Sequence, residues 1–413
     1  QIPLPRNIFQ GSHIPWLSSA GFDLDERATG IKFETANFQM TELSSDSSQR
    51  PECETDMTEN STGDLRSSTS PADSSVVGQY SEATQADVIA AIERARNSLP
   101  HWSSRCVTER AAILERAAEL FEARTAEFTS LIAKEAGRTL NDGLDEVREA
   151  VDFCRYYAAQ ATSLMHSELE LPGITGETNR LSYAPRGPWL CISPWNFPLA
   201  IFTGQIVANL AVGNTVVAKP AEQTPLVARL ACDVLNEAGV PEGVINLVNG
   251  DGPTLGGWLL PDERIAGVSF TGSHPSARVI NRQLALRDGP IIPLIAETGG
   301  INCMVVDSTA LPEQVVDDVI TSAFRSAGQR CSALRVLFVQ SDVADGIIEL
   351  LAGAMKELVV GDPHKLSTDV GPVIDQAAHD RISAHLMHLK ETATFIAKSC
   401  LLYTSDAADE HSW

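Results

Sequence analysis

The chain is poor in positive charge: 31 Lys and Arg stand against 54 Asp and Glu in 413 residues, a formal net charge of −23 at pH 7. Such an excess of negative charge repels phosphate backbones and anionic lipid, so we expect no nucleic acid among the partners. The chain also lacks a C-x-x-C pair and any His cluster at ligand spacing, although it has eight Cys. A structural zinc site is therefore disfavoured and no metal is expected, whereas scattered Cys suit the reduced thiols of a cytoplasmic protein.

A membrane span and an export signal are lacking as well. The longest apolar stretch, residues 199–218, is interrupted by Gln205, Asn209, Gly213 and Asn214, which makes it too polar to cross a bilayer. No basic patch followed by an apolar run opens the chain. Because the first residue is Gln rather than Met, we expect that an upstream part is missing.

The length exceeds that of one ordinary domain, so two or more cores are expected. Residues 1–75 are predicted to be an upstream connection and a polar linker. Residues 44–75 contain hardly any large apolar side chain, so burial there cannot offset the entropy of ordering. Helices are predicted from a cap at Thr84, with Asp87 three residues on, and over about 109–135 and 142–165.

From residue 188 the pattern changes to short apolar strands that alternate with helices. The strands are expected at residues 189–192, 214–218, 244–248, 265–270 and 291–296. This alternation predicts a parallel sheet covered on both faces, with ligands at the carboxyl ends of its strands. Five residues suited to ligand binding lie at or just beyond those ends: Asn196, Lys219, Gly250, Ser273 and Glu297.

A second unit of strands and helices is predicted after the sheet. Its elements are expected at residues 304–306, 313–327, 336–339 and 343–358. The fold class is therefore α/β. We expect a Rossmann-type parallel-sheet domain with N-terminal helices over residues 76–296, and a second α/β domain over residues 297–398.

Three residues far apart in the chain have side chains that together could oxidise an aldehyde. Cys331 supplies a thiol, which attacks a carbonyl carbon once it is ionised. The amide of Asn196 could stabilise the resulting oxyanion, an effect of roughly 3 kcal/mol per donor. Glu297 could then activate the water that hydrolyses the thioester. Taken singly, each residue type is more often structural, and Cys303, in an apolar run, is expected to be a buried hydrophobic side chain.

A dinucleotide site is indicated by Gly250 and Gly252, which follow a predicted strand and open a helix. The glycine spacing is not that of the usual fingerprint, so this segment alone is a weak signal. Lys219 and Glu222 lie just past the second strand, where an acidic side chain can bind ribose hydroxyls and repel a 2′-phosphate. On spacing alone, a solvated strand end explains this pair equally well. Residues 271–273 could present backbone and hydroxyl donors to the pyrophosphate, and the alternative for them is an ordinary helix cap.

Five blocks resemble signature sequences of the aldehyde dehydrogenase superfamily, in its order and at its spacing. They are SPWNFP at 193–198, KPAE at 219–222, FTGS at 270–273, ETGG at 297–300 and GQRC at 328–331. The resemblance covers roughly residues 65–390. It implies Cys331 as nucleophile, Glu297 as base and Asn196 as oxyanion donor. It also implies that the first domain binds NAD and that the second is catalytic.

The same resemblance implies which residues surround the ligands. Those around NAD would be Ile192, Ser193, Trp195, Lys219, Glu222, Gly252, Phe270, Ser273, Thr298 and Gly299. Glu149, Phe197 and Ser332 would line the aldehyde pocket.

Residues 146–153, 155–157, 202–205 and 368–375 are similar to the glutamate semialdehyde dehydrogenase branch, and above all to the dehydrogenase half of the bifunctional proline utilization A family. That half oxidises L-glutamate γ-semialdehyde to L-glutamate with NAD, the second step of proline catabolism. The resemblance implies a proline dehydrogenase upstream and a homo-oligomer. Two alternatives stay open: an enzyme for another aldehyde such as succinate semialdehyde, and an inactive nucleotide-binding fragment.

The resemblance ends near Lys398. Family members continue with a block that holds the nicotinamide ribose, a loop that grips the substrate carboxylate and a strand that crosses to a partner subunit. Residues 399–413 resemble nothing in the family. We therefore expect a catalytic domain that is truncated at its C-terminus, a hypothesis that an intact genomic locus encoding the same tail would refute.

Overall fold

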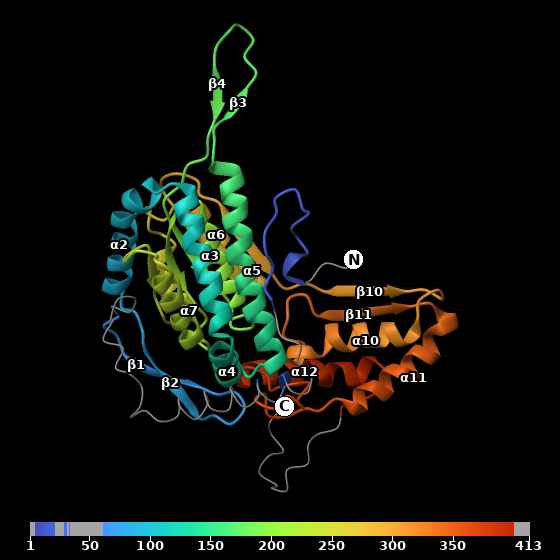
Figure 1. Ribbon diagram of the computed structural model, residues 1–413. Coiled ribbons are helices and arrows are strands. Elements are labelled where there is room, and N and C mark those ends of the chain that lie inside the picture. Colours follow the sequence, from blue (N-terminus) through green and yellow to red (C-terminus); the bar gives the residue numbers. More distant parts are fainter. Residues whose placement is uncertain (1–4, 21–28, 31–32, 34–60, 400–413) are drawn as a thin grey trace.

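The computed structural model of the protein describes residues 5–20, 29–30, 33 and 61–399. Its centre is a five-stranded sheet with the strand order β7-β6-β5-β8-β9 (Figure 1). The strands are β5 (Pro188–Ile192), β6 (Thr215–Lys219), β7 (Ile245–Leu247), β8 (Gly267–Gly272) and β9 (Leu294–Thr298). Every neighbouring pair runs parallel, which confirms the predicted sheet, although β9 begins at Leu294 rather than at residue 291.

Helices cover both faces of this sheet, because its strands are apolar on both sides. In β5, Trp189 and Cys191 belong to the larger core on one face, and Leu190 belongs to a second core on the other. The larger core includes residues of α3 (Val107–Ala123), α4 (Thr125–Ala136), α5 (Leu140–Met165), α6 (Ala200–Ala211) and α7 (Pro225–Ala238). The second core includes residues of α2 (Gln85–Ser104), α8 (Gly252–Leu259) and α9 (His274–Ala285). The prediction that both faces are covered is confirmed for β5, β6, β7 and most of β8, whereas residues 295–297 of β9 are exposed.

The helices before the sheet differ from the prediction at one point. The single helix expected over 109–135 is two helices, α3 and α4, because the backbone at Arg124 leaves the helical region (φ −101°, ψ 21°). The predicted cap of α2 is present: the Thr84 hydroxyl accepts the amide of Asp87, and the Asp87 carboxylate accepts the amide of Thr84. α4 ends at Ala136, and the next residue, Gly137, has a left-handed φ of 65°.

The segment before α2 contains an antiparallel pair of strands, β1 (Leu65–Thr69) and β2 (Val76–Ser81). The prediction of a linker or loop over residues 44–75 is therefore wrong for residues 65–69, whereas residues 44–60 lie outside the described residues. The reason is a tertiary contact: the Ser68 hydroxyl donates to the buried Glu135 carboxylate at 2.7 Å. A polar composition does not reveal such an anchor.

The second unit contains two parallel strands, β10 (Asn302–Val306) and β11 (Leu334–Val339). Its helices are α10 (Pro312–Ala323) and α11 (Ser341–Glu357), and α12 (Gln376–Thr392) follows them. The helix expected over 313–327 ends at Ala323, and a 3-10 turn, η2 (Arg325–Gly328), follows it. A further antiparallel pair, β3 (Leu169–Leu171) and β4 (Asn179–Leu181), projects from the body (Figure 1).

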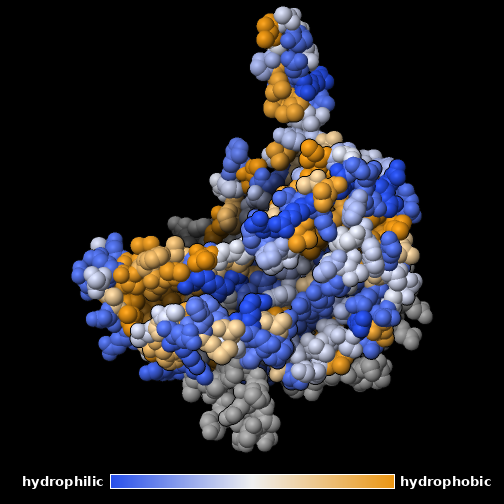
Figure 2. Space-filling view, turned by 180° about the vertical axis from the view of Figure 1, so that it is seen from behind, coloured by the Kyte–Doolittle hydropathy of each residue, from blue (hydrophilic) through white to orange (hydrophobic). Residues whose placement is uncertain are grey.

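One face of the β10–β11 pair is apolar and open to solvent, and Figure 2 shows a hydrophobic patch over this part of the molecule. Val305 and Phe338 pair in register, and they are 77% and 57% exposed. Cys303 lies two residues before Val305 and is also exposed, so the expectation that it is buried is wrong. Throughout the described ranges, none of the helices combines the length and the hydropathy that crossing a bilayer requires.

Candidate active site

The carboxyl ends of neighbouring strands form one edge of the sheet, and many of the predicted site residues lie along it. Ile192 pairs with Lys219 on one side and with Phe270 on the other. On the next strand, Glu297 pairs with Thr271. Parallel pairing thus places the ends of β6, β5, β8 and β9 next to one another, as the sequence predicted.

Cys331 lies in the loop between η2 and β11, and this loop has an unusual backbone. Ser326, Ala327 and Gly328 have successive left-handed φ angles of 56°, 53° and 67°. Such a conformation costs energy for Ser and Ala, and it persists only where surrounding contacts impose it. One such contact is the bond from Arg335 Nη2 to the carbonyl of Gly328 at 2.7 Å. At the thiol residue itself, Asn302 Nδ2 donates to the carbonyl of Cys331 at 2.8 Å.

Gln329 connects this loop to two other parts of the chain. Its side-chain Oε1 accepts the amide of Ile374 at 3.0 Å. Its backbone carbonyl accepts Nδ2 of Asn196 at 2.9 Å. The predicted oxyanion donor is thus bonded to the loop of Cys331. Because a side-chain amide carries two N–H groups, a second one is available for an oxyanion.

Cys331 and Glu297 line the same cavity, which has a volume of about 640 Å³. Its walls include Phe153 of α5, Gln205 of α6 and Thr271 of β8. Gln205 Nε2 donates to Thr271 Oγ1 at 3.0 Å, so the wall between the helix and the sheet is held in place. The thiol and the carboxylate therefore share one cavity, and the amide is bonded to the loop that carries the thiol.

Two of the residues expected around the aldehyde, Ser332 and Phe197, are sequence neighbours of Cys331 and Asn196, but neither lines the cavity of Cys331. Ser332 is exposed next to Cys331. Phe197 follows Asn196, and its ring packs under the guanidinium of Arg138, with 4.4 Å between the guanidinium carbon and the ring centroid. Cation–π packing of this kind holds the aromatic ring in one position.

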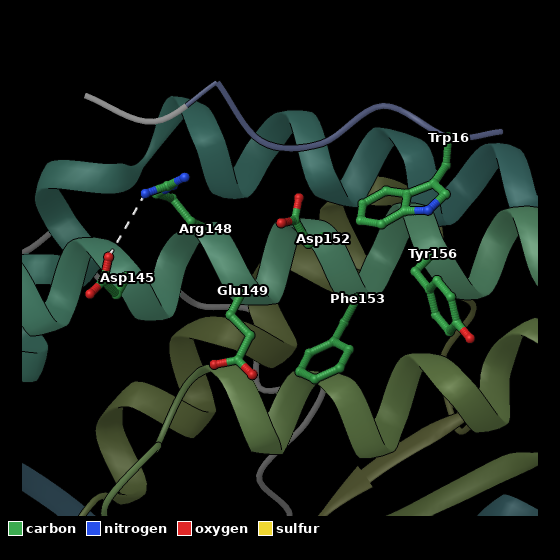
Figure 3. A pocket seen from close by; sticks show the side chains of 7 residues that line it. All are labelled: Trp16, Asp145, Arg148, Glu149, Asp152, Phe153 and Tyr156. Atoms are coloured by element: carbon green, nitrogen blue, oxygen red, sulfur yellow. Dashed lines mark ion pairs between the residues drawn. The ribbon is translucent and has the colours of Figure 1, made fainter. Parts of the chain in front are cut away.

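The third, Glu149, lines a neighbouring cavity of about 420 Å³ rather than the cavity of Cys331 (Figure 3). Figure 3 shows Glu149 on α5 near Phe153, a residue that borders both cavities, while Trp16 of the N-terminal segment lies at the other end. Burial raises the pKa of Glu149, and the charge of Arg138 partly opposes this shift. Glu149 is therefore adjacent to the expected pocket.

Two buried charged residues beside the site were not predicted, Arg138 and Glu146. They form an ion pair at 3.0 Å, and Glu146 also accepts the amides of Leu199 and Ala200 at the start of α6. Burial raises the pKa of Glu146 to about 7, although Arg138 and these amides oppose the shift. A signal for Glu146 was available in the sequence. Asp142 lies four residues before it, and this spacing places the two carboxylates on the same, buried face of α5.

The residues expected around NAD surround the same edge of the sheet. Lys219 is buried, and its Nζ lies 3.1 Å from Oε2 of Glu222. The start of α8 is close to this pair, because a Cβ added to Gly252 would lie 3.9 Å from Lys219 Nζ. Ser273 caps α9 by accepting the amide of Ser276 at 3.2 Å. Two helices that begin beside the sheet edge suit the phosphates of a dinucleotide.

The end of β5 and the segment that follows it contribute three of the expected residues. Ser193 is buried, and its amide donates to the carbonyl of Lys219 at 3.1 Å. Its hydroxyl is also buried, without a hydrogen-bond partner in the described part of the chain. Ile192 and Trp195 are partly buried against the second and the larger core, respectively. A buried, unbonded hydroxyl at this edge fits a polar ligand.

The remaining three lie on the other side of the edge. Phe270 is buried in the second core. Thr298 ends β9, and Gly299 has open space where a side chain would project. These positions leave the backbone after β9 accessible to a ligand.

The chain belongs to the aldehyde dehydrogenase family, whose profile matches residues 57–401. The bifunctional protein PutA of Escherichia coli (strain K12) is 44% identical over 418 residues, which cover 100% of this chain and 30% of that protein. The 1-pyrroline-5-carboxylate dehydrogenase of Geobacillus sp. (strain WCH70) is 40% identical over 75% of this chain and 61% of that protein. The chain thus spans about a third of the length of its PutA relatives.

Solved structures agree with the sequence relatives. A crystal structure of bifunctional proline utilization A (PutA) has a TM-score of 0.84 at 47% identity, over 98% of this chain and 37% of that chain. A mutant of Thermus thermophilus 1-pyrroline-5-carboxylate dehydrogenase has a TM-score of 0.84 at 29% identity, over 92% of this chain and 74% of that chain. The predicted family and the predicted α/β fold are confirmed.

Proposed function

We propose that this protein oxidises L-glutamate γ-semialdehyde to L-glutamate and reduces NAD. The observation that carries the proposal is the cavity shared by Cys331 and Glu297, together with the bond from the Asn196 amide to the loop of Cys331. The relatives named PutA and 1-pyrroline-5-carboxylate dehydrogenase support this aldehyde as the substrate.

Each of the three residues has one role in the reaction. The Cys331 thiolate adds to the aldehyde carbon, and the second N–H of Asn196 stabilises the oxyanion that forms. When bound at the carboxyl ends of the strands, NAD would supply a hydride acceptor, so that this carbon could lose hydride, re-form its carbonyl and remain on Cys331 as a thioester. Glu297 then takes a proton from water, which attacks the thioester carbon and releases the acid and the Cys331 thiolate.

The contacts at the end of β6 support NAD over NADP. The carboxylate of Glu222 lies beside Lys219 at the sheet edge where the adenosine ribose would bind. A 2′-phosphate on that ribose would bring negative charge close to this carboxylate, whereas ribose hydroxyls could donate to it. We assign NAD binding to residues 76–296 and catalysis to residues 297–398.

Formation of NADH from glutamate γ-semialdehyde by the purified protein tests the proposal. Cys331→Ala should abolish it, whereas Cys303→Ala, which removes another exposed thiol, should not. Equal NADH formation by the wild type and Cys331→Ala would overturn the proposal. A higher rate with succinate semialdehyde than with glutamate γ-semialdehyde would favour succinate semialdehyde as the substrate. NAD binding without oxidation of either aldehyde would indicate a nucleotide-binding fragment.

The PutA relatives bear on the partners of the protein, since they are bifunctional and about three times as long as this chain. We propose that a proline dehydrogenase lies upstream in the same polypeptide, and that the protein acts in the cytoplasm as a homo-oligomer. The full-length open reading frame tests the first point, and light scattering on the purified protein tests the oligomer. Fractionation of cells tests the location.

A further inference from the structure

Arg138 contacts both chain segments that carry the proposed catalytic groups. It follows Gly137 at the end of α4, and only 6% of its surface is exposed. Its Nη1 donates to the backbone carbonyl of Asn196, and its Nη2 donates to the hydroxyl of Ser326 at 3.2 Å. One guanidinium thus bridges the loop of the amide and the loop of the thiol.

The contact with Ser326 acts on the strained part of the loop that leads to Cys331. Ser326 is the first of the three successive left-handed residues. Its hydroxyl accepts from Arg138 and donates to the carboxylate of Asp142 at 2.9 Å. Because a left-handed Ser persists only where neighbours impose that conformation, these two bonds help to stabilise it, together with the bond from Gln329 Nε2 to the Ser326 carbonyl at 3.2 Å.

The contact with Asn196 is reinforced by two neighbours. The ring of Phe197 stacks against the guanidinium at 4.4 Å, and Nη1 pairs with the fully buried Glu146 at 3.0 Å. Glu146 is itself held by the amide of Leu199, which donates at 2.9 Å. A planar guanidinium can make all these contacts at once, whereas the ammonium of a Lys is a point charge on a flexible stem.

We propose that Arg138 is a positioning residue that holds the Asn196 amide and the Cys331 loop in the relative orientation that thiol addition to the aldehyde requires. The catalytic consequence rests on the proposed function, whereas the coupling of the two loops does not. The bond from Asn196 Nδ2 to the carbonyl of Gln329, at 2.9 Å, already joins the loops. Arg138 supplies a second connection, and two connections fix the orientation of two loops as well as their separation.

Steady-state kinetics of Arg138→Lys and Ser326→Ala test the proposal. Both should lower kcat by roughly 10- to 100-fold and leave KM for NAD unchanged, because a small misplacement of reacting groups costs rates of this order. Arg155→Lys is the matched control: Arg155 is 1% exposed and pairs with Glu122 at 2.9 Å. It should lose stability and retain kcat.

A double-mutant cycle separates positioning from stability. If Arg138 acts through Asn196, Arg138→Lys should have little further effect on kcat in an Asn196→Ala background. If Arg138→Lys lowered kcat by the same factor in the Asn196→Ala background as in the wild type, the proposal would be overturned. Ser326→Ala keeps the ion pair of Arg138 with Glu146, so it tests the same contact even where Arg138→Lys folds poorly.

Hydrogen–deuterium exchange tests the coupling without turnover. The Gln329 amide donates to the carbonyl of Ser326 at 3.0 Å, so its exchange reports on the left-handed turn. Arg138→Lys should accelerate exchange both in peptides that cover residues 193–199 and in peptides that cover residues 324–333. Ser326→Ala should accelerate exchange only over residues 324–333. Arg155→Lys should change exchange in neither segment. Unchanged exchange in both loops would overturn the proposal. A wild-type protein that oxidises no aldehyde would refute the proposed function, and this measurement would still decide the coupling.

Discussion

Replacing the buried Glu135 by Gln should remove part of the pH dependence of stability. Glu135 is fully buried in α4, and its carboxyl accepts the amides of Leu226 and Val227 at 3.0 and 2.9 Å, at the start of α7. Burial raises its pKa from 4.5 to about 7, and these hydrogen bonds oppose the shift without cancelling it. The folded protein therefore keeps a proton that the unfolded chain has already released.

The sign of the effect follows from this difference. Below about pH 4.5 the carboxyl is protonated in both states, and the stabilising contribution of the retained proton is fully present. Stability then falls as the pH rises, because the unfolded chain ionises first, and the loss is complete above about pH 7. A shift of about 2.5 pH units corresponds to about 3 kcal/mol. Gln does not titrate, so Glu135→Gln lacks this loss.

Urea denaturation at a series of pH values measures the effect. The free energy of unfolding of Glu135→Gln, minus that of the wild type, should increase by about 3 kcal/mol between about pH 4.5 and about pH 7. Glu349→Gln, which makes the same substitution on the exposed surface of α11, is the control measured in parallel. A difference for Glu135→Gln that stays constant or decreases would show that the hydrogen bonds from α7 outweigh burial, and it would refute the reasoning.

Three further predictions concern the site and the core. Asn196→Ala should lower kcat by about 100-fold or more, because an oxyanion donor is lost, and an unchanged kcat would remove Asn196 from the mechanism. Glu222→Gln should raise kcat/KM with NADP relative to NAD, because a carboxylate beside Lys219 is neutralised, and an unchanged ratio would show that Glu222 does not discriminate. Phe128→Ala should lower the free energy of unfolding by about 3–5 kcal/mol, since Phe128 is fully buried with its ring centroid 5.3 Å from that of Phe121. Urea denaturation checks this value, and a loss below about 1 kcal/mol would contradict it.

The sheet could be predicted because its strands have a strong local signal. Residues 188–191 of β5 and all of β6 are buried, and their sequences are short apolar runs that turns and helices separate. The break between α3 and α4 could not be predicted in this way, since no Gly or Pro marks Arg124. β1 was missed for the opposite reason: its composition is polar, and pairing with β2 and the contact of Ser68 with Glu135 stabilise it.

The residues of the candidate site also fall into those that the sequence predicted and those that it did not. Glu297 and Asn196 were predicted from their places at strand ends, and Cys331 from the chemistry of its thiol and from the block GQRC at 328–331. Arg138 and Glu146 were missed, because a buried ion pair is defined by partners that are distant in the chain. Glu149 was expected in the aldehyde pocket but lines the adjacent cavity, and Phe153 of the same helix borders both cavities.

The sequence by itself determined the parallel α/β sheet, the caps at Thr84 and Ser273, and the set of reactive side chains, because periodicity and capping act between residues that are close in the chain. Only the tertiary structure decided that Cys331 and Glu297 share a cavity and that Arg138 bridges the two loops. Those contacts depend on how complete helices and strands pack against one another, and no local pattern encodes that packing.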